Sequence, residues 1–83
     1  MQNSSWINGY LTSEPEEFVL GNTRFLYFTV ETDDGEELEI ITAGTPVIYL
    51  KDVAVGNFIN VAVKKSCIES FELFATCVIP VPN

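Results

Sequence analysis

The sequence predicts an all-β domain, a five-stranded barrel with one short helix between its third and fourth strands. Three features lead to this prediction. Apolar and polar residues alternate along several segments, with the period of two that is typical of half-buried strands. Gly9 lies in the middle of the first of these segments, and a Thr-Pro pair at residues 45–46 opens a short apolar stretch that is a candidate helix.

The size of the chain bounds the architecture. Its 83 residues are enough for one domain, which we place at residues 1–83. Hydrophobic residues make up 47% of the chain, so a core can form without a metal or a disulfide framework. The first residues lack the features of a signal peptide, and no apolar run is long enough to span a membrane. We therefore expect a cytoplasmic protein without a membrane partner, in which Cys67 and Cys77 are free thiols.

The first strand is predicted at residues 6–12. Gly9 in its middle allows the bend that a strand needs in order to pair with two neighbours in a small barrel. Residues 13–22 are polar, include a proline and end in Gly-Asn. They are interpreted as a loop, with a short strand around residues 18–20 as an alternative.

The clearest strand pattern covers residues 23–32. Leu26, Phe28 and Val30 share one face, which we expect to point into the core. The other face carries Phe25, Tyr27, Thr29 and Glu31.

A tight hairpin follows this strand. Asp34-Gly35 supplies the positive φ that tight hairpin turns require. Residues 37–42 return as the third strand, with Leu38 and Ile40 inward.

The second half of the chain supplies the predicted helix and the last two strands. Thr45 can cap a helix that has Pro46 at its first position, and Gly56 would end that segment. Residues 57–64 alternate again, and residues 71–79 form the last strand. A helix between the third and fourth of five strands is the order of an OB-fold. The alternatives, an SH3-like barrel and a small sandwich, do not normally place a helix there.

The chain resembles bacterial single-stranded-DNA-binding proteins of the OB-fold class. Three segments carry the resemblance: GYLTSEPE at residues 9–16, GNTRFLYFTVE at residues 21–31 and AGTPVIYLKDVAVGNFINV at residues 43–61. They look like that family's first strand, its glycine turn with an alternating strand, and its short helix with the fourth strand. The resemblance implies an OB-fold and single-stranded DNA as the ligand.

The chain departs from that family in its connections. The hairpin at residues 33–37 is short and acidic where the family usually has a long, basic one, and residues 41–43 lack a tryptophan that the family often carries there. The connection at residues 64–70 is also shortened. These departures remove parts of the family's fold that would support strong binding of single-stranded DNA.

Sequence-tolerant binding of single strands requires aromatic rings that stack on bases and cations that follow the phosphates. Phe25 and Tyr27 lie on the outward face of a strand that helps to form the ligand groove of OB-folds. The candidate nucleic-acid-binding residues are Phe25, Tyr27, Trp6, Tyr10, Arg24, Lys64 and Lys65. We expect the other large rings to pack in the core or over the ends of the barrel, namely Phe28, Phe58, Phe71 and Phe74.

The net charge of −8 favours a second hypothesis. A negative field repels phosphate and speeds association with a cationic surface. In this alternative, an acidic OB-fold protein of the kind that a phage or mobile element encodes binds a basic protein. The candidate interaction residues are Asp33, Asp34, Glu36 and Glu37. A homodimer through an exposed strand edge or through the aromatic face is also open.

Catalysis has little support in the sequence. The chain has no histidine, so the commonest general base and metal ligand are missing. It also has no glycine-rich phosphate loop, and the hairpin carboxylates lack the regular spacing of a calcium loop. We expect a non-enzymatic binding module without catalytic residues, a metal or a cofactor.

Overall fold

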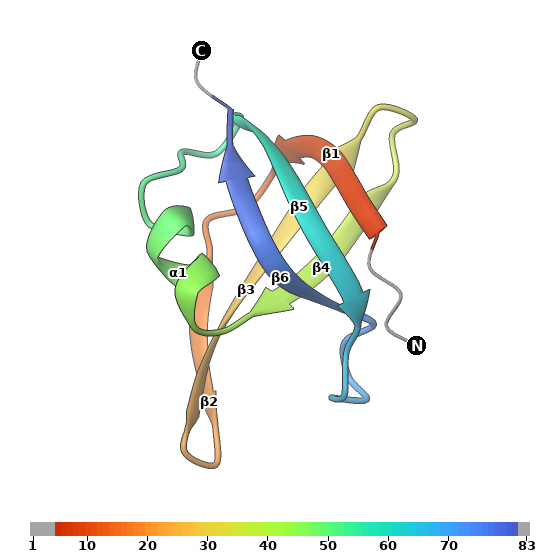
Figure 1. Ribbon diagram of the computed structural model, residues 1–83. Helices are drawn as coiled ribbons and strands as arrows, with labels where there is room; N and C mark the ends of the chain where they lie inside the picture. Colours follow the sequence, from red (N-terminus) through yellow and green to blue (C-terminus); the bar gives the residue numbers. More distant parts are fainter. Residues whose placement is uncertain (1–4, 82–83) are drawn as a thin grey trace.

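The structure is a computed structural model that describes residues 5–81, which form six strands and one helix (Figure 1). The strands are β1 (Ser5–Leu11), β2 (Glu16–Leu20), β3 (Thr23–Thr32), β4 (Glu37–Thr42), β5 (Phe58–Lys65) and β6 (Leu73–Pro80). The helix α1 (Thr45–Leu50) lies between β4 and β5 in the chain. No helix among residues 5–81 is long and apolar enough to cross a membrane.

Five strands close into a barrel in the order β1-β5-β6-β4-β3, and β1 completes the ring by pairing with β3. All neighbours are antiparallel except β4 and β6, which are parallel. The strand β2 pairs with β3 outside the ring, so that the two project from the barrel as a hairpin (Figure 1). A closed five-stranded barrel with a helix after its third strand confirms the predicted OB-fold.

Gly9 is where β1 bends between its two neighbours. It pairs with Thr32 on β3 and with Ile59 on β5. A Cβ atom at this position would lie 2.8 Å from Cγ1 of Val30 and would also collide with the carbonyl oxygen of Glu31. The predicted role of Gly9 is therefore confirmed, because any larger residue would push β1 away from β3.

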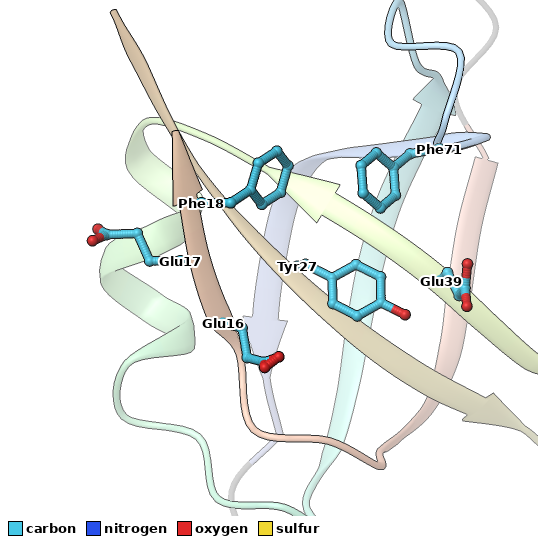
Figure 2. A pocket seen from close by; sticks show the side chains of 6 residues that line it. All are labelled: Glu16, Glu17, Phe18, Tyr27, Glu39 and Phe71. Carbon is cyan, nitrogen blue, oxygen red and sulfur yellow. The ribbon is translucent and has the colours of Figure 1, made fainter. Parts of the chain in front are cut away.

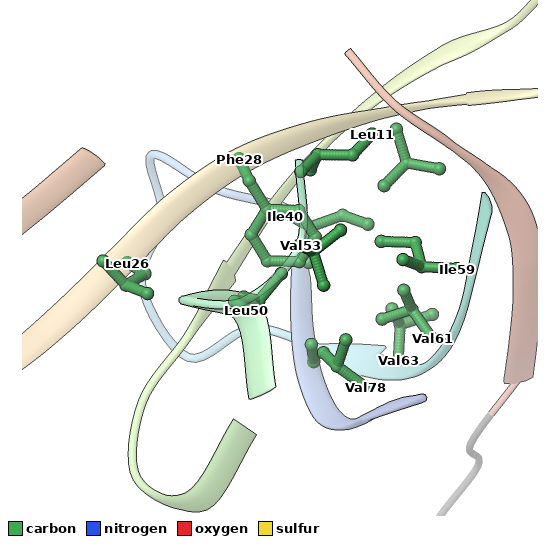
Figure 3. Packing of buried hydrophobic residues seen from close by; sticks show 12 residues of the cluster. Leu11, Leu26, Phe28, Ile40, Leu50, Val53, Ile59, Val61, Val63 and Val78 are labelled. Carbon is green, nitrogen blue, oxygen red and sulfur yellow. The ribbon is translucent and has the colours of Figure 1, made fainter. Parts of the chain in front are cut away.

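Alternating aliphatic residues fill the barrel, as Figure 3 shows. Leu26, Phe28 and Val30 point inward from β3 as predicted, and Phe28 and Val30 are completely buried. The buried cluster consists of Leu11, Leu26, Phe28, Val30, Ile40, Leu50, Val53, Ile59, Val61, Val63, Ala75 and Val78. Since α1 and the turn after it contribute Leu50 and Val53, this segment closes one end of the core.

Two segments differ from the prediction. The segment at residues 13–22, interpreted as a loop, contains β2, which includes the alternative short strand around residues 18–20 and begins two residues before it, because this stretch pairs with the start of β3. The last strand begins at Leu73 rather than at residue 71, because its first parallel partner on β4 is Ile40.

The ends of α1 also differ. Thr45 is its first residue, the N-cap is Gly44, and no side chain caps the helix by a hydrogen bond. The helix ends at Leu50. Gly56 instead donates its N–H to the carbonyl of Leu11 at 2.7 Å, which ties the following turn to the end of β1.

Candidate nucleic-acid interface

The β2–β3 hairpin places three aromatic rings on one surface. Leu20 pairs with Thr23 across a two-residue turn, and this register sets Phe18 opposite Phe25 and Glu16 opposite Tyr27. Directly paired residues project from the same face of a sheet. Phe18, Phe25 and Tyr27 therefore share the outer face, where the Phe18 and Phe25 rings stack with centroids 5.2 Å apart.

The row of outward side chains continues around the barrel. Tyr27 pairs with Ile41 on β4, Ile41 pairs with Phe74 on β6, and Phe74 pairs with Lys64 on β5. The Nζ of Lys64 lies 5.7 Å from the centroid of the Phe74 ring. A cation therefore stands at the end of an apolar row.

Phe71, in the connection before β6, lies between this row and the β2–β3 hairpin. Its ring centroid lies 5.5 Å from that of Phe18 and 5.6 Å from that of Tyr27. We call the resulting surface the aromatic face. It consists of Phe18, Phe25, Tyr27, Phe71 and Phe74.

The aromatic face is a second apolar layer outside the barrel. Ile41 is completely buried but is not part of the cluster inside the barrel. Its neighbours in the outward row are Tyr27 and Phe74. Side chains of the outer surface must therefore cover it, which indicates that the rings lie close against the sheet.

A shallow hollow of about 360 Å³ opens on this face (Figure 2). Its lining consists of Glu16, Glu17, Phe18, Tyr27, Glu39 and Phe71. Figure 2 shows the carboxylates of Glu16 and Glu39 on either side of the Tyr27 ring, whereas Glu17 points away from the rings. The hollow thus combines aromatic walls with a negatively charged rim.

Several groups raise the pKa of Tyr27 above its ordinary value. The largest effect is partial desolvation of the phenol, followed by a hydrogen bond that its hydroxyl donates to the Glu39 carboxylate. The negative charges of Glu39, Glu37 and Glu16 add to the shift. All of these effects disfavour a tyrosinate. Tyr27 is therefore a neutral ring in a negative environment.

The three predicted cations lie in different places. Arg24 pairs with Val19, one position away from Phe25, and so projects from the opposite face of the hairpin. It forms an ion pair with Glu17 at 3.8 Å. By the same alternation Lys65 points away from the aromatic face, whereas Lys64 points toward it. Of these three, Lys64 is the cation that the structure brings to the rings.

Tyr10 is outward and 47% exposed, but it lies apart from Tyr27. It pairs with Glu31, four residues further along β3, a separation of about 13 Å along a strand. Its own aromatic neighbour is Phe58, at 5.1 Å and edge-on.

Trp6 is outward and 56% exposed. It pairs with Ala62, two residues from Lys64 on β5. Outward positions two residues apart on neighbouring strands are diagonal neighbours. Trp6 therefore lies beyond Lys64, at the far end of the row that starts at Tyr27.

The acidic hairpin is an ordered turn. Its carboxylates are exposed, namely those of Asp33, Asp34, Glu36 and Glu37. The hydroxyl of Thr32 donates to Asp34, and this bond, together with one from the backbone of Glu36, lowers the pKa of Asp34. Within residues 5–81, no group of three or more acidic, cysteine or histidine side chains is arranged to hold a metal ion.

Sequence reasoning missed several members of the site. Phe71 and Phe74 were expected in the core or over the barrel ends, but both lie on the outer face. Phe28 is in the core, and Phe58 is half-buried against Tyr10. Phe74 lies outside because the parallel pairing of β4 with β6 sets it beside Ile41 on the outward row. Phe71 lies in the connection before β6, with its ring against those of Phe18 and Tyr27.

A local signal could have identified one further member. A two-residue turn at Gly21-Asn22 fixes the register of the strands on both sides. Counting outward from that turn places Phe18 opposite Phe25. The same count places Glu16 opposite Tyr27, whereas no comparable pattern marks Phe71 as a neighbour of Tyr27.

Comparison with known proteins identifies the fold. No protein-family model and no curated protein sequence matches this chain. Among solved structures, the mitochondrial single-stranded DNA binding protein Rim1 from S. cerevisiae aligns with a TM-score of 0.80 at 20% identity, over 100% of this chain and 98% of that chain. The second single-stranded DNA binding protein (SSBb) from Mycobacterium smegmatis gives a TM-score of 0.76 at 15% identity, over 96% and 89%. The chain therefore has the OB-fold of these proteins, and the predicted resemblance is confirmed for the fold.

Proposed function

We propose that this protein is a non-enzymatic OB-fold module that binds single-stranded nucleic acid across its aromatic face. The observation that carries the proposal is the aromatic face on the outside of β2, β3 and β6, whose rings lie on either side of Ile41 and which ends at Lys64. The structural similarity to two proteins described as single-stranded DNA binding proteins supports it.

Stacking accounts for most of the expected affinity. Every base offers a π-face, and each stacked base contributes about 1–3 kcal/mol. The row crosses four strand intervals from β2 to β5, or about 19 Å at the usual spacing between strands. A short segment of single-stranded nucleic acid can therefore lie across the aromatic face with its bases against the rings.

Charge sets the side of the aromatic face on which the phosphate backbone of the nucleic acid passes. Lys64 can contact a phosphate at one end of the row. Glu16 and Glu39 repel phosphates at the hollow, so the backbone should pass on the Lys64 side while the bases face the rings. With few cations available, we expect modest affinity.

The test is fluorescence anisotropy of a labelled oligothymidine at low salt. The Phe25→Ala/Tyr27→Ala variant removes two rings and should weaken binding roughly 30-fold or more, from at least 1 kcal/mol for each lost stack. The matched control is Tyr49→Ala, since Tyr49 is an exposed ring on α1 and should bind like the unchanged protein. Thermal melts by circular dichroism show whether each variant is folded.

Two results would contradict the proposal. One is the lack of saturable binding by the unchanged protein even at low salt. The other is an equal loss of affinity in Tyr49→Ala and in the double variant, which would indicate that the rings of the aromatic face make no specific contribution.

A basic protein partner at the acidic hairpin is the second candidate. Glu31 and Glu37 are directly paired across β3 and β4, and like charges in such a pair destabilise a sheet. A cationic surface against the hairpin would relieve this repulsion. In that case, neutralising Asp33 and Glu36 would release the partner.

A further inference from the structure

The hollow on the aromatic face carries negative charges, which repel a phosphate backbone. Two of its carboxylates, those of Glu16 and Glu39, flank the ring of Tyr27 (Figure 2). Within residues 5–81 the ion pair present is that of Glu17 with Arg24. Glu16 and Glu39 therefore face the hollow without a basic side chain of the described chain against them.

Aromatic rings and carboxylates attract the same kind of group. A cation over the face of a ring is drawn to its π-electrons, and a carboxylate adds direct charge attraction. The guanidinium of arginine suits both at once, because it is planar, stacks on rings and donates several hydrogen bonds in a fixed fork. Its aliphatic stem can also lie along apolar surface, which Phe18 and Phe71 provide here.

We propose that the hollow between Phe18, Tyr27 and Phe71 binds an arginine side chain from a basic segment of a partner protein. Charge complementarity favours this occupant. Glu16 and Glu39 stand at the hollow, the outward pair Glu31–Glu37 extends the negative surface along β3 and β4, and the whole chain carries a net charge of −8. The same carboxylate charges that raise the pKa of Tyr27 also attract a cation to the hollow. This inference does not depend on the proposed nucleic-acid binding.

The test uses a defined probe, the acetylated pentapeptide Gly-Ser-Arg-Ser-Gly, followed by ¹H–¹⁵N NMR. The control peptide contains citrulline in place of arginine, which keeps the shape of the side chain and removes its charge. The arginine peptide should cause saturable shifts centred on Phe18, Tyr27, Glu39 and Phe71. The citrulline peptide should bind at least roughly tenfold more weakly, because it lacks the cation that the rings and carboxylates attract.

Matched variants separate the hollow from the overall negative field. Glu16→Gln/Glu39→Gln removes two charges at the hollow and should weaken binding of the arginine peptide roughly tenfold. Asp33→Asn/Glu36→Gln removes two charges at the hairpin and should change it by no more than about twofold. Equal losses in the two variants would overturn the proposal, and so would shifts centred on the hairpin or equal binding of both peptides.

The same variants distinguish this inference from nucleic-acid binding. Oligothymidine should bind Glu16→Gln/Glu39→Gln as tightly as the unchanged protein or more tightly, because phosphate repulsion falls. A protein that binds oligothymidine but not the arginine peptide would overturn the arginine site alone. A protein that binds the peptide but not oligothymidine would overturn the nucleic-acid proposal alone.

Discussion

Gly9 is the residue on which closure of the barrel depends most directly. Its backbone pairs with β3 on one side and β5 on the other. The space that a side chain would need is occupied by Val30 and by the backbone of Glu31. The constraint is steric, because backbone atoms cannot move aside in the way that the end of a flexible side chain can.

Replacing Gly9 with alanine should lower the free energy of unfolding by roughly 1–3 kcal/mol, the usual cost of an overpacked core position. For a domain of this size the melting temperature should fall by about 4–8 °C per kcal/mol. Chemical denaturation and thermal melts would measure both quantities.

Asn8→Ala is the matched control for Gly9→Ala. Asn8 precedes Gly9 on β1 and is exposed, so its replacement should change stability by no more than about 0.5 kcal/mol. Similar stabilities of the two variants would show that β1 can separate from β3 at little cost.

At the scale of elements, the two hairpins carry different side chains. The β2–β3 hairpin projects from the barrel and carries Phe18 and Phe25 on its outward face. The β3–β4 hairpin ends in a turn in which Gly35 has a φ of +84°, as the Asp-Gly pair predicts. The hydrogen bonds from Thr32 and from the backbone of Glu36 to Asp34 hold that turn together.

The hydrogen bonds to Asp34 lead to a prediction about how the stability of this turn depends on pH. Because the pKa of Asp34 is lowered in the folded chain, its ionised form stabilises the turn above the ordinary aspartate pKa, and this contribution is lost as the pH falls through the lowered value. Thr32→Val removes the largest cause and should raise the pKa of Asp34 toward its ordinary value. A ¹³C NMR titration of the carboxyl group measures it.

Thr23→Val is the control for this change, because Thr23 is an exposed threonine at the other end of β3. It should leave the titration of Asp34 unaltered. An unchanged pKa of Asp34 in Thr32→Val would mean that the hydroxyl of Thr32 does not stabilise the carboxylate.

At the scale of the whole molecule, charge opposes binding of the proposed nucleic-acid ligand. The net charge is −8, and Lys64 is the predicted cation that lies beside the rings. Association with phosphate is therefore expected to depend on stacking more than on charge. The dependence of affinity on salt measures the balance.

Binding of oligothymidine should weaken only slightly with salt. If one or two phosphates are neutralised, the logarithm of the binding constant should fall with the logarithm of salt concentration with a slope of about −0.7 to −1.4. Anisotropy titrations between about 50 and 200 mM salt, over which the effect is usually large, would give the slope.

Lys64→Gln should reduce the size of that slope by about 0.7, the value for one phosphate of a single strand. Lys51→Gln removes a charge next to α1 and should leave the slope unchanged. A slope steeper than about −3 would contradict the prediction, because it corresponds to more phosphate contacts than the cations near the aromatic face can make.

Features encoded within a few neighbouring residues could be predicted. Alternation along residues 23–32 correctly assigned the inward and outward faces of β3, and Phe25 and Tyr27 lie outward as expected. The Asp-Gly turn and the bend at Gly9 were predictable because each depends on a local backbone requirement. The binding roles of the candidate residues stay predictions.

By itself, therefore, the sequence determined the order of the five barrel strands, the faces of β3 and the OB-fold, because backbone preferences and a period of two act over short distances. Only the tertiary structure decided that Phe71 and Phe74 join Phe18 and Tyr27 on the aromatic face. These residues come from separate strands and a connection. Their meeting depends on the parallel register of β4 with β6, which is a long-range pairing that no local pattern encodes.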